Sequence, residues 1–425
     1  MVVVTVIGLG FVGLTTALGF AELGNIVYGY DINKSRMKTL ENGHIEILEP
    51  FLEEKLNEHS NKQFYLSKNM SEMMTMSDCI FICVGSPCNE DGSVDLSQVK
   101  TAIQSCLENI PSDGKYRTLV IKSTVPPGTC SRELMPLVKD KMHARDMIGL
   151  ASNPEFLREG KCWEDFMSPS RVVLGSNDSK ALEVLKELYK PLRVPIHCLS
   201  TNGAEFSKYL SNVMLATMIS FSNELAYAAK CFGDIDIVKT FEVLHDDFRL
   251  RNAGIASYIY PGCGYGGYCL PKDIQAFATA LGTVGYNSVM LQSVININNS
   301  VIERLCDEIC EAATDYEVIG VLGLAFKPET DDVRDTASYH IIKNLIERGY
   351  SKVGVYDPAA MTAFKSRYPE LRVIYYNSAE ILVDNSDVLI VATAWREFTE
   401  LDYKGKKIID GRYIIKEKND YGKQI

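Results

Sequence analysis

Two copies of one alternating pattern of apolar runs constrain the fold of this chain more than any other feature of its sequence. The copies contain VVVTVIGLGF (2–11), IVYGYDIN (26–33) and SDCIFICVG (77–85), then VIGVLGLAF (318–326), KVGVYDPA (352–359) and SDVLIVATA (386–394). Continuous apolar strands that alternate with helical stretches are typical of parallel sheets covered on both faces. The sequence therefore predicts an α/β protein with two doubly wound, Rossmann-like domains.

The segment 203–233 lies between the two copies and has the period of a helix. Apolar side chains recur there at steps of three and four residues: Phe206, Leu210, Met214, Met218, Phe221, Leu225 and Ala228. Glu205, Lys208, Asn212 and Glu224 make the segment too polar to span a membrane. We expect one long central helix that joins the domains and offers a dimer surface.

Composition and charge narrow the class of protein. The net charge of −11 without a basic stripe argues against nucleic-acid binding. No run of eighteen apolar residues appears, which argues against a membrane span. The first residues, MVVVTVIGLG, do not have the basic region or cleavage site typical of an export signal, which favours a cytosolic protein. Its twelve dispersed cysteines predict reduced, mostly buried thiols, and no cluster of cysteine and histidine has the spacing of a metal site. We expect a cytoplasmic protein without a metal, a nucleic-acid partner or a membrane partner.

The first copy carries the glycine pattern GLGFVG at Gly8, Gly10 and Gly13. It follows a predicted strand and begins a predicted helix, and the next predicted strand ends at Asp31. This context is typical of dinucleotide binding, with the pyrophosphate at the helix amino terminus and the carboxylate on the ribose hydroxyls. The carboxylate favours NAD over NADP. The alternative is a glycine turn used only for packing.

The second copy departs from this pattern. It keeps Gly323 but has Ala325 and Pro328 in place of the second and third glycines, and it adds Lys327 at the end of the strand. The carboxyl ends of parallel strands are where such sheets bind ligands. We expect a different phosphorylated ligand, held by side chains, with Arg334 and Arg412 as further candidates. The alternative for each cation is a solvated side chain.

The stretch PGCGYGGYCLPKD (261–273) singles out Cys269 among the twelve cysteines. Pro271 is suited to the first position of a helix, which would place the thiol at the positive end of the helix dipole and beside Lys272. Both effects favour a thiolate. The glycines before the cysteine remove side-chain bulk and leave room for a substrate. The sequence predicts a nucleophile, with a structural cysteine as the alternative.

Several polar residues recur four positions apart, the spacing that places two side chains on one face of a helix. The pairs are Glu155 with Glu159, Lys208 with Asn212, and Cys269 with Asp273. Each pair could present two functional groups to one cavity, although surface ion pairs have the same spacing. Thr124, in KSTVPPGT (122–129), lies at the expected carboxyl edge of the first sheet.

Taken in order, these motifs resemble the nucleotide-sugar dehydrogenases, the UDP-glucose/GDP-mannose dehydrogenase family. The motifs are GLGFVG, KSTVPPGT, NPEFLREG, Lys208 with Asn212, GYGGYCLPKD, GLAFKPETDDVRD and DGR. The resemblance covers nearly the whole chain. It implies an NAD domain over 1–199, a central helical dimerisation domain with the catalytic cysteine over 200–300, and a UDP-sugar domain over 301–425. It also implies oxidation of a sugar C6 alcohol to a carboxylate with two NAD.

The resemblance also assigns residue roles. Cys269 would form a thiohemiacetal and then a thioester, with Lys208, Asp273 and Asn212 supporting oxyanions and water. Glu155 would be the base in thioester hydrolysis, Thr124 would position a water, and Glu159 would lie beside the nicotinamide. The other implied cofactor contacts are Gly8, Gly10, Phe11, Val12, Gly13, Asp31, Lys34, Ser86 and Thr124. The implied substrate contacts are Phe156, Leu157, Arg158, Lys208, Asn212, Tyr258, Gly266, Lys327 and Arg412.

Two positions depart from the family pattern, and a third position, Tyr268, indicates the substrate. GSPC (85–88) replaces the usual Thr-Pro-Thr, and Ala253 replaces an arginine expected across the dimer, for which Arg249 or Arg251 would substitute. Tyr268 before the cysteine resembles the UDP-glucose branch, whereas the GDP-mannose and N-acetylhexosamine branches typically have serine or histidine. A two-electron hydroxyacid dehydrogenase would need no cysteine. A noncatalytic NAD-binding scaffold would not need Cys269, Lys208 and Asp273 together.

Overall fold

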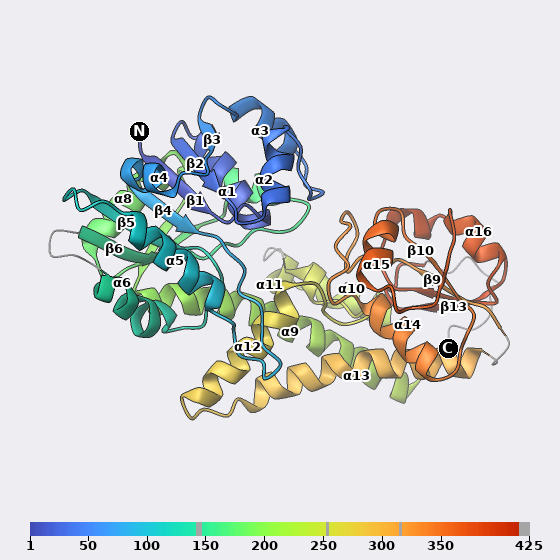
Figure 1. The fold of residues 1–425 in the computed structure, drawn as a ribbon. Helices are drawn as coiled ribbons and strands as arrows, with labels where there is room; N and C mark the ends of the chain where they lie inside the picture. The colour runs from blue at the N-terminus through green and yellow to red at the C-terminus, as the bar shows by residue number, and fades with distance from the viewer. Residues whose placement is uncertain (142–146, 252–254, 314–316, 416–425) are drawn as a thin grey trace. The chain divides into compact units, whose positions relative to one another are not determined.

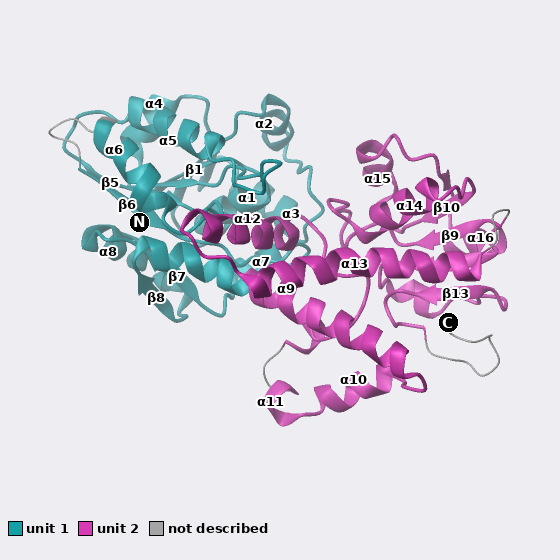
Figure 2. Cartoon of the chain, turned by 90° about the horizontal axis from the view of Figure 1, so that it is seen from below, with its two compact units in different colours: residues 1–211 teal, residues 212–425 magenta. Residues whose placement is uncertain are grey.

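The computed structural model describes residues 1–141, 147–251, 255–313 and 317–415. The chain divides into two compact units, 1–211 and 212–425, which Figure 2 shows in teal and magenta. They are called the first and second unit below, and each is described by itself.

The first unit is built on an eight-stranded sheet with the order β3-β2-β1-β4-β5-β6-β7-β8. Its strands are β1 (Val3–Ile7), β2 (Ile26–Tyr30), β3 (Phe64–Leu66), β4 (Cys79–Ile82), β5 (Tyr116–Ile121), β6 (Met147–Ser152), β7 (Val172–Gly175) and β8 (Ile196–Leu199). The pairings are parallel except that of β6 with β7, which is antiparallel at Ser152 and Gly175. The prediction of a purely parallel sheet is wrong at this one pair.

Helices cover both faces of this sheet (Figure 1). They are α1 (Phe11–Glu22), α2 (Lys34–Glu41), α3 (Leu52–His59), α4 (Met70–Met76), α5 (Ser97–Asn109), the π-helical turn η1 (Cys130–Leu134), α6 (Met135–Lys141), α7 (Cys162–Met167), α8 (Ser179–Tyr189) and the 3₁₀ turn η2 (Lys190–Leu192). Because side chains alternate along a strand, Phe81 and Val120 pack under α1, α3, α7 and α8. Ile80 and Ile121 pack under α4, α5 and α6. Burial on both faces explains the continuous apolar runs.

The second unit contains a five-stranded parallel sheet with the order β11-β10-β9-β12-β13. Its strands are β9 (Ile319–Leu322), β10 (Val353–Tyr356), β11 (Ile374–Tyr375), β12 (Val388–Val391) and β13 (Lys407–Asp410). This order repeats that of the first five strands of the other sheet, so the predicted internal repeat and the two Rossmann-like sheets are confirmed. The helices after β9 are α14 (Ala337–Glu347), α15 (Met361–Arg367), α16 (Ala379–Asp384) and the 3₁₀ turn η4 (Arg396–Thr399).

The predicted central helix is confirmed as α9 (Thr201–Phe232), which begins in the first unit and continues into the second. In the second unit its later turns pack on α13 (Val289–Ala312), where Ser220 donates to the Val294 carbonyl and Lys230 pairs with Glu308. The other helices here are α10 (Ile237–His245), α11 (Phe248–Arg251), the 3₁₀ turn η3 (Ala256–Tyr258) and α12 (Cys269–Thr283).

The apolar stripe of α9 is largely exposed. Five of its side chains are between 43% and 55% exposed: Phe206, Leu210, Met214, Phe221 and Leu225. In the part of the chain that the structure describes, no helix combines the length and apolar character needed to cross a membrane.

Candidate active site

The glycine turn of the first unit is open where a phosphate would approach. A Cβ at Gly13 would lie 1.7 Å from the Gly8 carbonyl oxygen, and Gly8 has a φ of +90°, so packing explains these two glycines. A Cβ at Gly10 would meet nothing within 4 Å. Gly10 also caps α1 without a side-chain hydrogen bond, ahead of Phe11 and Val12. An uncapped helix start beside open space fits a pyrophosphate.

Asp31 connects the end of β2 to this turn. It is buried, and its carboxylate accepts the Leu9 N–H at 2.7 Å, the Asn33 N–H at 2.8 Å and the Arg36 guanidinium at 3.0 Å. Lys34, the first residue of α2, is exposed. Sequence reasoning missed Arg36, although an arginine one turn into the helix after the acidic strand end is a signal for the charge around the cofactor ribose.

In the second unit, Asp357 is the counterpart of Asp31, and hydrogen bonds within the protein use up its capacity to accept a ligand. Asp357 at the end of β10 accepts five donors: the backbone N–H groups of Leu324, Ala325, Ala359 and Ala360, and the Trp395 indole N–H. A carboxylate offers about four lone pairs, so none remains for a ribose. Lys327 instead lies beyond the end of β9, and the Arg412 N–H binds Asp410 at the end of β13. Both cations therefore lie at the predicted carboxyl edge of the second sheet.

In the first unit, Lys208 on α9 forms an ion pair with Glu155, with 2.9 Å between Nζ and Oε1. Both side chains are buried. The Lys208 ammonium also lies 5.5 Å from the centre of the Phe156 ring, and the Leu157 N–H donates to the other Glu155 oxygen. A lysine and a carboxylate that are buried together can exchange a proton and stabilise an oxyanion.

Glu155 and Glu159 do not share a helical face, because residues 153–158 form an irregular loop. Side-chain carboxylates take up the backbone donors of this loop: Asp165 accepts the Arg158 N–H, and Glu49 accepts the Gly160 N–H at 2.5 Å. These bonds replace helical hydrogen bonds, which is why the prediction from four-residue spacing is wrong here. Glu49 was missed, since its own segment shows no motif.

Ser86 and Thr124 are linked at the carboxyl edge of the first sheet. The Ser86 hydroxyl donates to the Thr124 carbonyl at 2.7 Å, which connects GSPC to KSTVPPGT. Arg158 forms a bidentate ion pair with Asp165, and Glu159 and Leu157 are half-buried on the same loop.

In the second unit, α12 begins at Cys269, two residues earlier than predicted from Pro271. Proline is tolerated within the whole first turn, because the first N–H groups of a helix have no intrahelical acceptor. The predicted placement of Cys269 at the helix amino terminus is confirmed, and its side chain is exposed. All twelve cysteines are described and none of them forms a disulfide, and six of the twelve are buried rather than most.

Below Cys269, Asp273 is fully buried and accepts the Asn212 amide at 2.6 Å. Its other oxygen pairs with Lys272 at 2.5 Å. Burial lowers the pKa of Lys272, but the Asp273 carboxylate outweighs burial and the net pKa is raised. The four-residue spacing of Cys269 and Asp273 lies on a helix, as does that of Lys208 and Asn212 on α9.

The glycines before Cys269 serve packing of the loop. Gly264 and Gly267 have positive φ. A Cβ at Gly264 would lie 2.6 Å from Asn298 Oδ1, and one at Gly266 would lie 2.5 Å from the Asp335 carbonyl oxygen. A Cβ at Gly267 would lie 2.8 Å from the Phe326 ring. Asn298 also accepts the Tyr265 N–H at 2.7 Å and donates to the Tyr265 carbonyl. These glycines are therefore also required by packing, while room for a substrate before the sulfur stays a prediction. Asn298 is an anchor that sequence reasoning missed.

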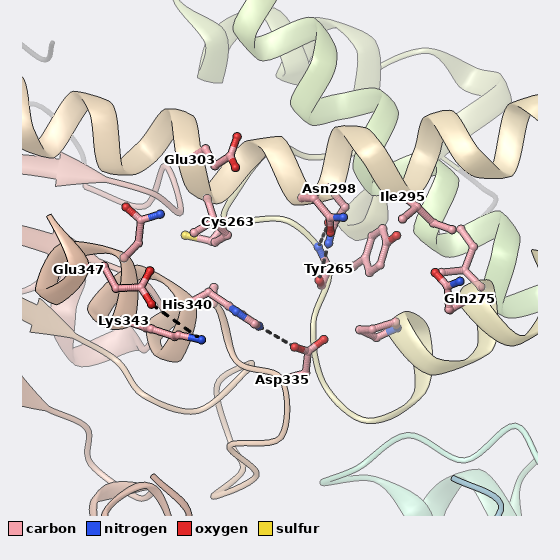
Figure 3. A pocket seen from close by; sticks show the side chains of 16 residues that line it. Cys263, Tyr265, Gln275, Ile295, Asn298, Glu303, Asp335, His340, Lys343 and Glu347 are labelled. Atoms are coloured by element: carbon pink, nitrogen blue, oxygen red, sulfur yellow. Dashed lines mark hydrogen bonds and ion pairs between the residues drawn. The ribbon is translucent and has the colours of Figure 1, made fainter. Parts of the chain in front are cut away.

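A cavity of about 500 Å³ lies beside this loop, between α12, α13 and α14 (Figure 3). Tyr265 forms part of its wall, and charges of both signs surround it: Asp335 pairs with His340 at 2.6 Å and Lys343 with Glu347 at 4.0 Å. With the three carboxylates of Glu303, Asp335 and Glu347 against one lysine, this lining lacks the positive field that a pyrophosphate needs.

The remaining predicted substrate contacts belong to the second unit. Tyr258 is half-buried in η3, and the Arg412 guanidinium donates to the Ala392 carbonyl at 2.6 Å. Arg334 lies over the Tyr268 ring at 4.4 Å and pairs with Asp332. Of the positions considered for the dimer contact, Ala253 lies outside the described residues, while Arg249 and Arg251 form ion pairs with Asp247 and Asp246.

Comparison with known proteins covers nearly the whole chain. Three domains of the UDP-glucose/GDP-mannose dehydrogenase family match: the NAD-binding domain at residues 2–193, the central domain at 202–300 and the UDP-binding domain at 320–417. The chain is 35% identical to the UDP-glucose 6-dehydrogenase AglM of Haloferax volcanii, over 97% of this chain and 96% of that protein.

Two solved structures agree with this assignment. A UDP-glucose dehydrogenase from Pyrobaculum islandicum has a TM-score of 0.91 and 38% identity, covering 97% of this chain and 95% of that one. A UDP-D-ManNAc dehydrogenase from Pyrococcus horikoshii has a TM-score of 0.84 and 28% identity, covering 98% and 96%. The expected NAD cofactor is confirmed. The chain is an NAD-dependent dehydrogenase that belongs to the UDP-glucose/GDP-mannose dehydrogenase family.

Proposed function

We propose that this chain oxidises UDP-glucose to UDP-glucuronate. The observation that carries the proposal is the exposed Cys269 at the start of α12, together with the buried Asp273 and its two partners, the buried Asn212 and the half-buried Lys272. The helix amino terminus and the Lys272 ammonium stabilise a thiolate there. A dehydrogenase that stops at an aldehyde has no use for a nucleophile, whereas oxidation to a carboxylate has.

The relatives and Tyr268 support the choice of sugar. The similar proteins from Haloferax volcanii and Pyrobaculum islandicum are named for UDP-glucose. The alternatives are a UDP-N-acetylhexosamine, for which the Pyrococcus horikoshii structure is the precedent, and GDP-mannose, which the family description includes.

In the proposed mechanism, the Gly8–Gly13 turn would hold two NAD molecules one after the other, and each would supply an acceptor for one hydride. Asp273 and Lys208 bind the C6 oxygen through its changes of charge, and Asn212 orients Asp273. The Cys269 thiolate adds to the C6 aldehyde to give a thiohemiacetal, and the second oxidation leaves a thioester. Glu155 takes a proton from water as the water attacks the thioester carbonyl, the C–S bond breaks and the thiolate leaves.

Ligand binding is proposed to follow the two sheets. Gly8, Gly10, Phe11, Val12, Gly13, Asp31, Lys34, Ser86, Thr124 and Glu159 would contact the cofactor. Phe156, Leu157, Arg158, Tyr258, Gly266, Lys327 and Arg412 would contact the UDP-sugar, together with Lys208 and Asn212. We assign an NAD domain to 1–199, a central domain to 200–300 and a UDP-sugar domain to 301–425.

A homodimer formed through α9 is part of the proposal. The exposed apolar stripe of that helix supports it, because a second copy would cover the stripe. Twelve cysteines without a disulfide among them, three of them exposed, suit a reducing compartment, and we propose the cytoplasm.

The stoichiometry of NADH tests the reaction. With limiting UDP-glucose, the parent should form two NADH per sugar and no free aldehyde, and the product should be a uronate by chromatography. A panel with GDP-mannose and UDP-N-acetylhexosamines ranks substrates by kcat/KM. Cys269→Ala should abolish uronate formation while NAD binding persists. Cys198→Ala, an exposed thiol of β8, is the matched control. One NADH per sugar, or normal uronate production by Cys269→Ala, would refute the proposal.

A further inference from the structure

Lys122 is a buried ammonium group that the proposed mechanism does not use. It follows β5 directly, is 4% exposed, and its Nζ lies 3.0 Å from Asn153 Oδ1 and 3.5 Å from the Tyr189 hydroxyl. Both partners are uncharged. Burying an ammonium between neutral groups costs free energy, and a methionine would fill the same space at a lower cost. Packing alone therefore does not explain a lysine at this position.

The partner that Lys122 holds is the first residue of the Glu155 loop. The Asn153 amide donates to the Val173 carbonyl at 2.9 Å, and its backbone N–H binds the Ile121 carbonyl at 2.8 Å. The side-chain oxygen of Asn153, Oδ1, accepts hydrogen bonds from both the Lys122 ammonium and the Tyr189 hydroxyl. With these bonds made, the Asn153 side chain is fixed on all sides, and Pro154 and Glu155 follow it directly in the chain.

The loop is thus held on both sides: Glu49 binds Gly160, two residues beyond its end, and Lys122 holds its first residue, Asn153. In between, Glu155 is buried against Lys208. A buried carboxylate remains ionised when positive charge lies near it. The Coulomb interaction between Lys122 and Glu155 is attractive, while that between Lys122 and Lys208 is repulsive.

We propose that Lys122 is a positioning residue for Glu155. It fixes Asn153 and thereby the start of the loop, and it adds a second positive charge near the Glu155 carboxylate. The inference rests on the proposed function, in which Glu155 accepts the proton of the water that hydrolyses the thioester. Lys122 itself contacts neither the sugar nor the thioester in this role.

A double-mutant cycle of Lys122→Met and Glu155→Gln tests the inference. Lys122→Met should lower kcat about tenfold to a hundredfold, change KM for UDP-glucose less than about threefold, and accumulate an adduct with the mass of a UDP-uronyl group on Cys269. In the Glu155→Gln background the same change should lower kcat less than about threefold, because residues that act through one another are not additive. Lys100→Met, a surface lysine of α5, is the control and should match the parent.

The pH dependence supplies a second readout. The groups facing Lys122 are Asn153, Tyr189, Cys83, Glu155 and Lys208. Burial is the largest cause that lowers the pKa of Lys122 to about 8. Lys122 therefore carries its charge below this pH and loses it above, while Lys122→Met lacks the charge throughout. The ratio of parent kcat to variant kcat should fall as pH rises through about 8, because the parent then loses the charge that the variant lacks throughout. Titrations that Lys122 does not influence cancel in the ratio.

Tyr189→Phe keeps the inference testable if Lys122→Met does not fold. It removes one donor to Asn153 and preserves the ring, which packs edge-on against Phe20 at 5.2 Å. It should lower kcat in the same direction and also be non-additive with Glu155→Gln. Additive losses, or a kcat ratio that does not change with pH, would overturn the role of Lys122. A parent that forms one NADH per sugar would instead refute the proposed function.

Discussion

Replacing Asp31 by asparagine is expected to weaken NAD binding and to relax discrimination against NADP. The change removes the charge and preserves the shape. The amide oxygen of asparagine can still accept the Leu9 N–H that Asp31 holds at 2.7 Å, so the glycine turn should survive. Arg36, which pairs with the carboxylate at 3.0 Å, loses its partner at that end of the site.

The expected magnitude follows from these contacts. A hydrogen bond to a charged group contributes about 1.5–3 kcal/mol against about 1 kcal/mol for a neutral one, so loss of the ribose acceptor should raise KM for NAD about tenfold. A carboxylate and a phosphate about 5 Å apart repel by about 3 kcal/mol per pair of unit charges at an effective dielectric constant of 20. Removing this repulsion and freeing Arg36 should raise the ratio of kcat/KM for NADP over NAD about tenfold to a hundredfold.

The assay is kcat/KM for NAD and for NADP at saturating UDP-glucose, together with Tm. The second unit supplies the matched control, because Asp357 is the counterpart of Asp31 in the repeat. Asp357→Asn loses charge from five hydrogen bonds and should lower Tm, yet leave the cofactor ratio unchanged. The reasoning about Asp31 fails if its variant keeps the parent ratio, or if Asp357→Asn shifts the ratio equally.

Further expectations concern the second unit. Lys327→Ala should raise KM for UDP-glucose about tenfold or more while Kd for NAD, measured by fluorescence titration, stays within about twofold, because an ammonium close to a phosphate contributes a few kcal/mol. Equal losses of affinity for UDP-glucose and for NAD would refute the assignment of Lys327 to the UDP-sugar site. Asn298→Ala removes two hydrogen bonds to Tyr265 and should lower Tm by several degrees and speed alkylation of Cys269 by iodoacetamide. An unchanged alkylation rate would show that Asn298 does not anchor the loop.

The strands and the central helix were predictable because local chemistry specifies them. Apolar runs bounded by glycine and aspartate give β1, β2, β9 and β10, and the helix expected over 203–233 is Thr201–Phe232. The antiparallel pairing of β7 was not predictable, since alternation of side chains does not encode strand direction. The loop 153–158 was taken for helix because a four-residue spacing also fits an irregular segment whose donors bind distant carboxylates.

The residues of the candidate site that lie in sequence motifs were predictable, whereas the residues that hold them in place were not. Cys269, Asp31 and Lys208 lie in patterns whose chemistry is visible in the sequence. Arg36 and Asn298 act through partners that only the fold brings near. Lys122 was predictable in part. A lysine directly after the apolar run TLVI indicates a buried charge, but its partner Asn153 follows the neighbouring strand, and the sequence does not show that pairing.

The two copies of the repeat show how one fold supports two ligands. Asp31 and Asp357 end equivalent strands, yet the first accepts three donors and the second accepts five. With about four lone pairs per carboxylate, the first retains capacity for a ribose and the second has none. Gly10 faces open space where the second copy has Ala325. The second sheet has therefore lost the backbone site for a pyrophosphate. This supports the proposal that side chains such as Lys327 and Arg412, which follow its strands, hold a phosphorylated ligand there.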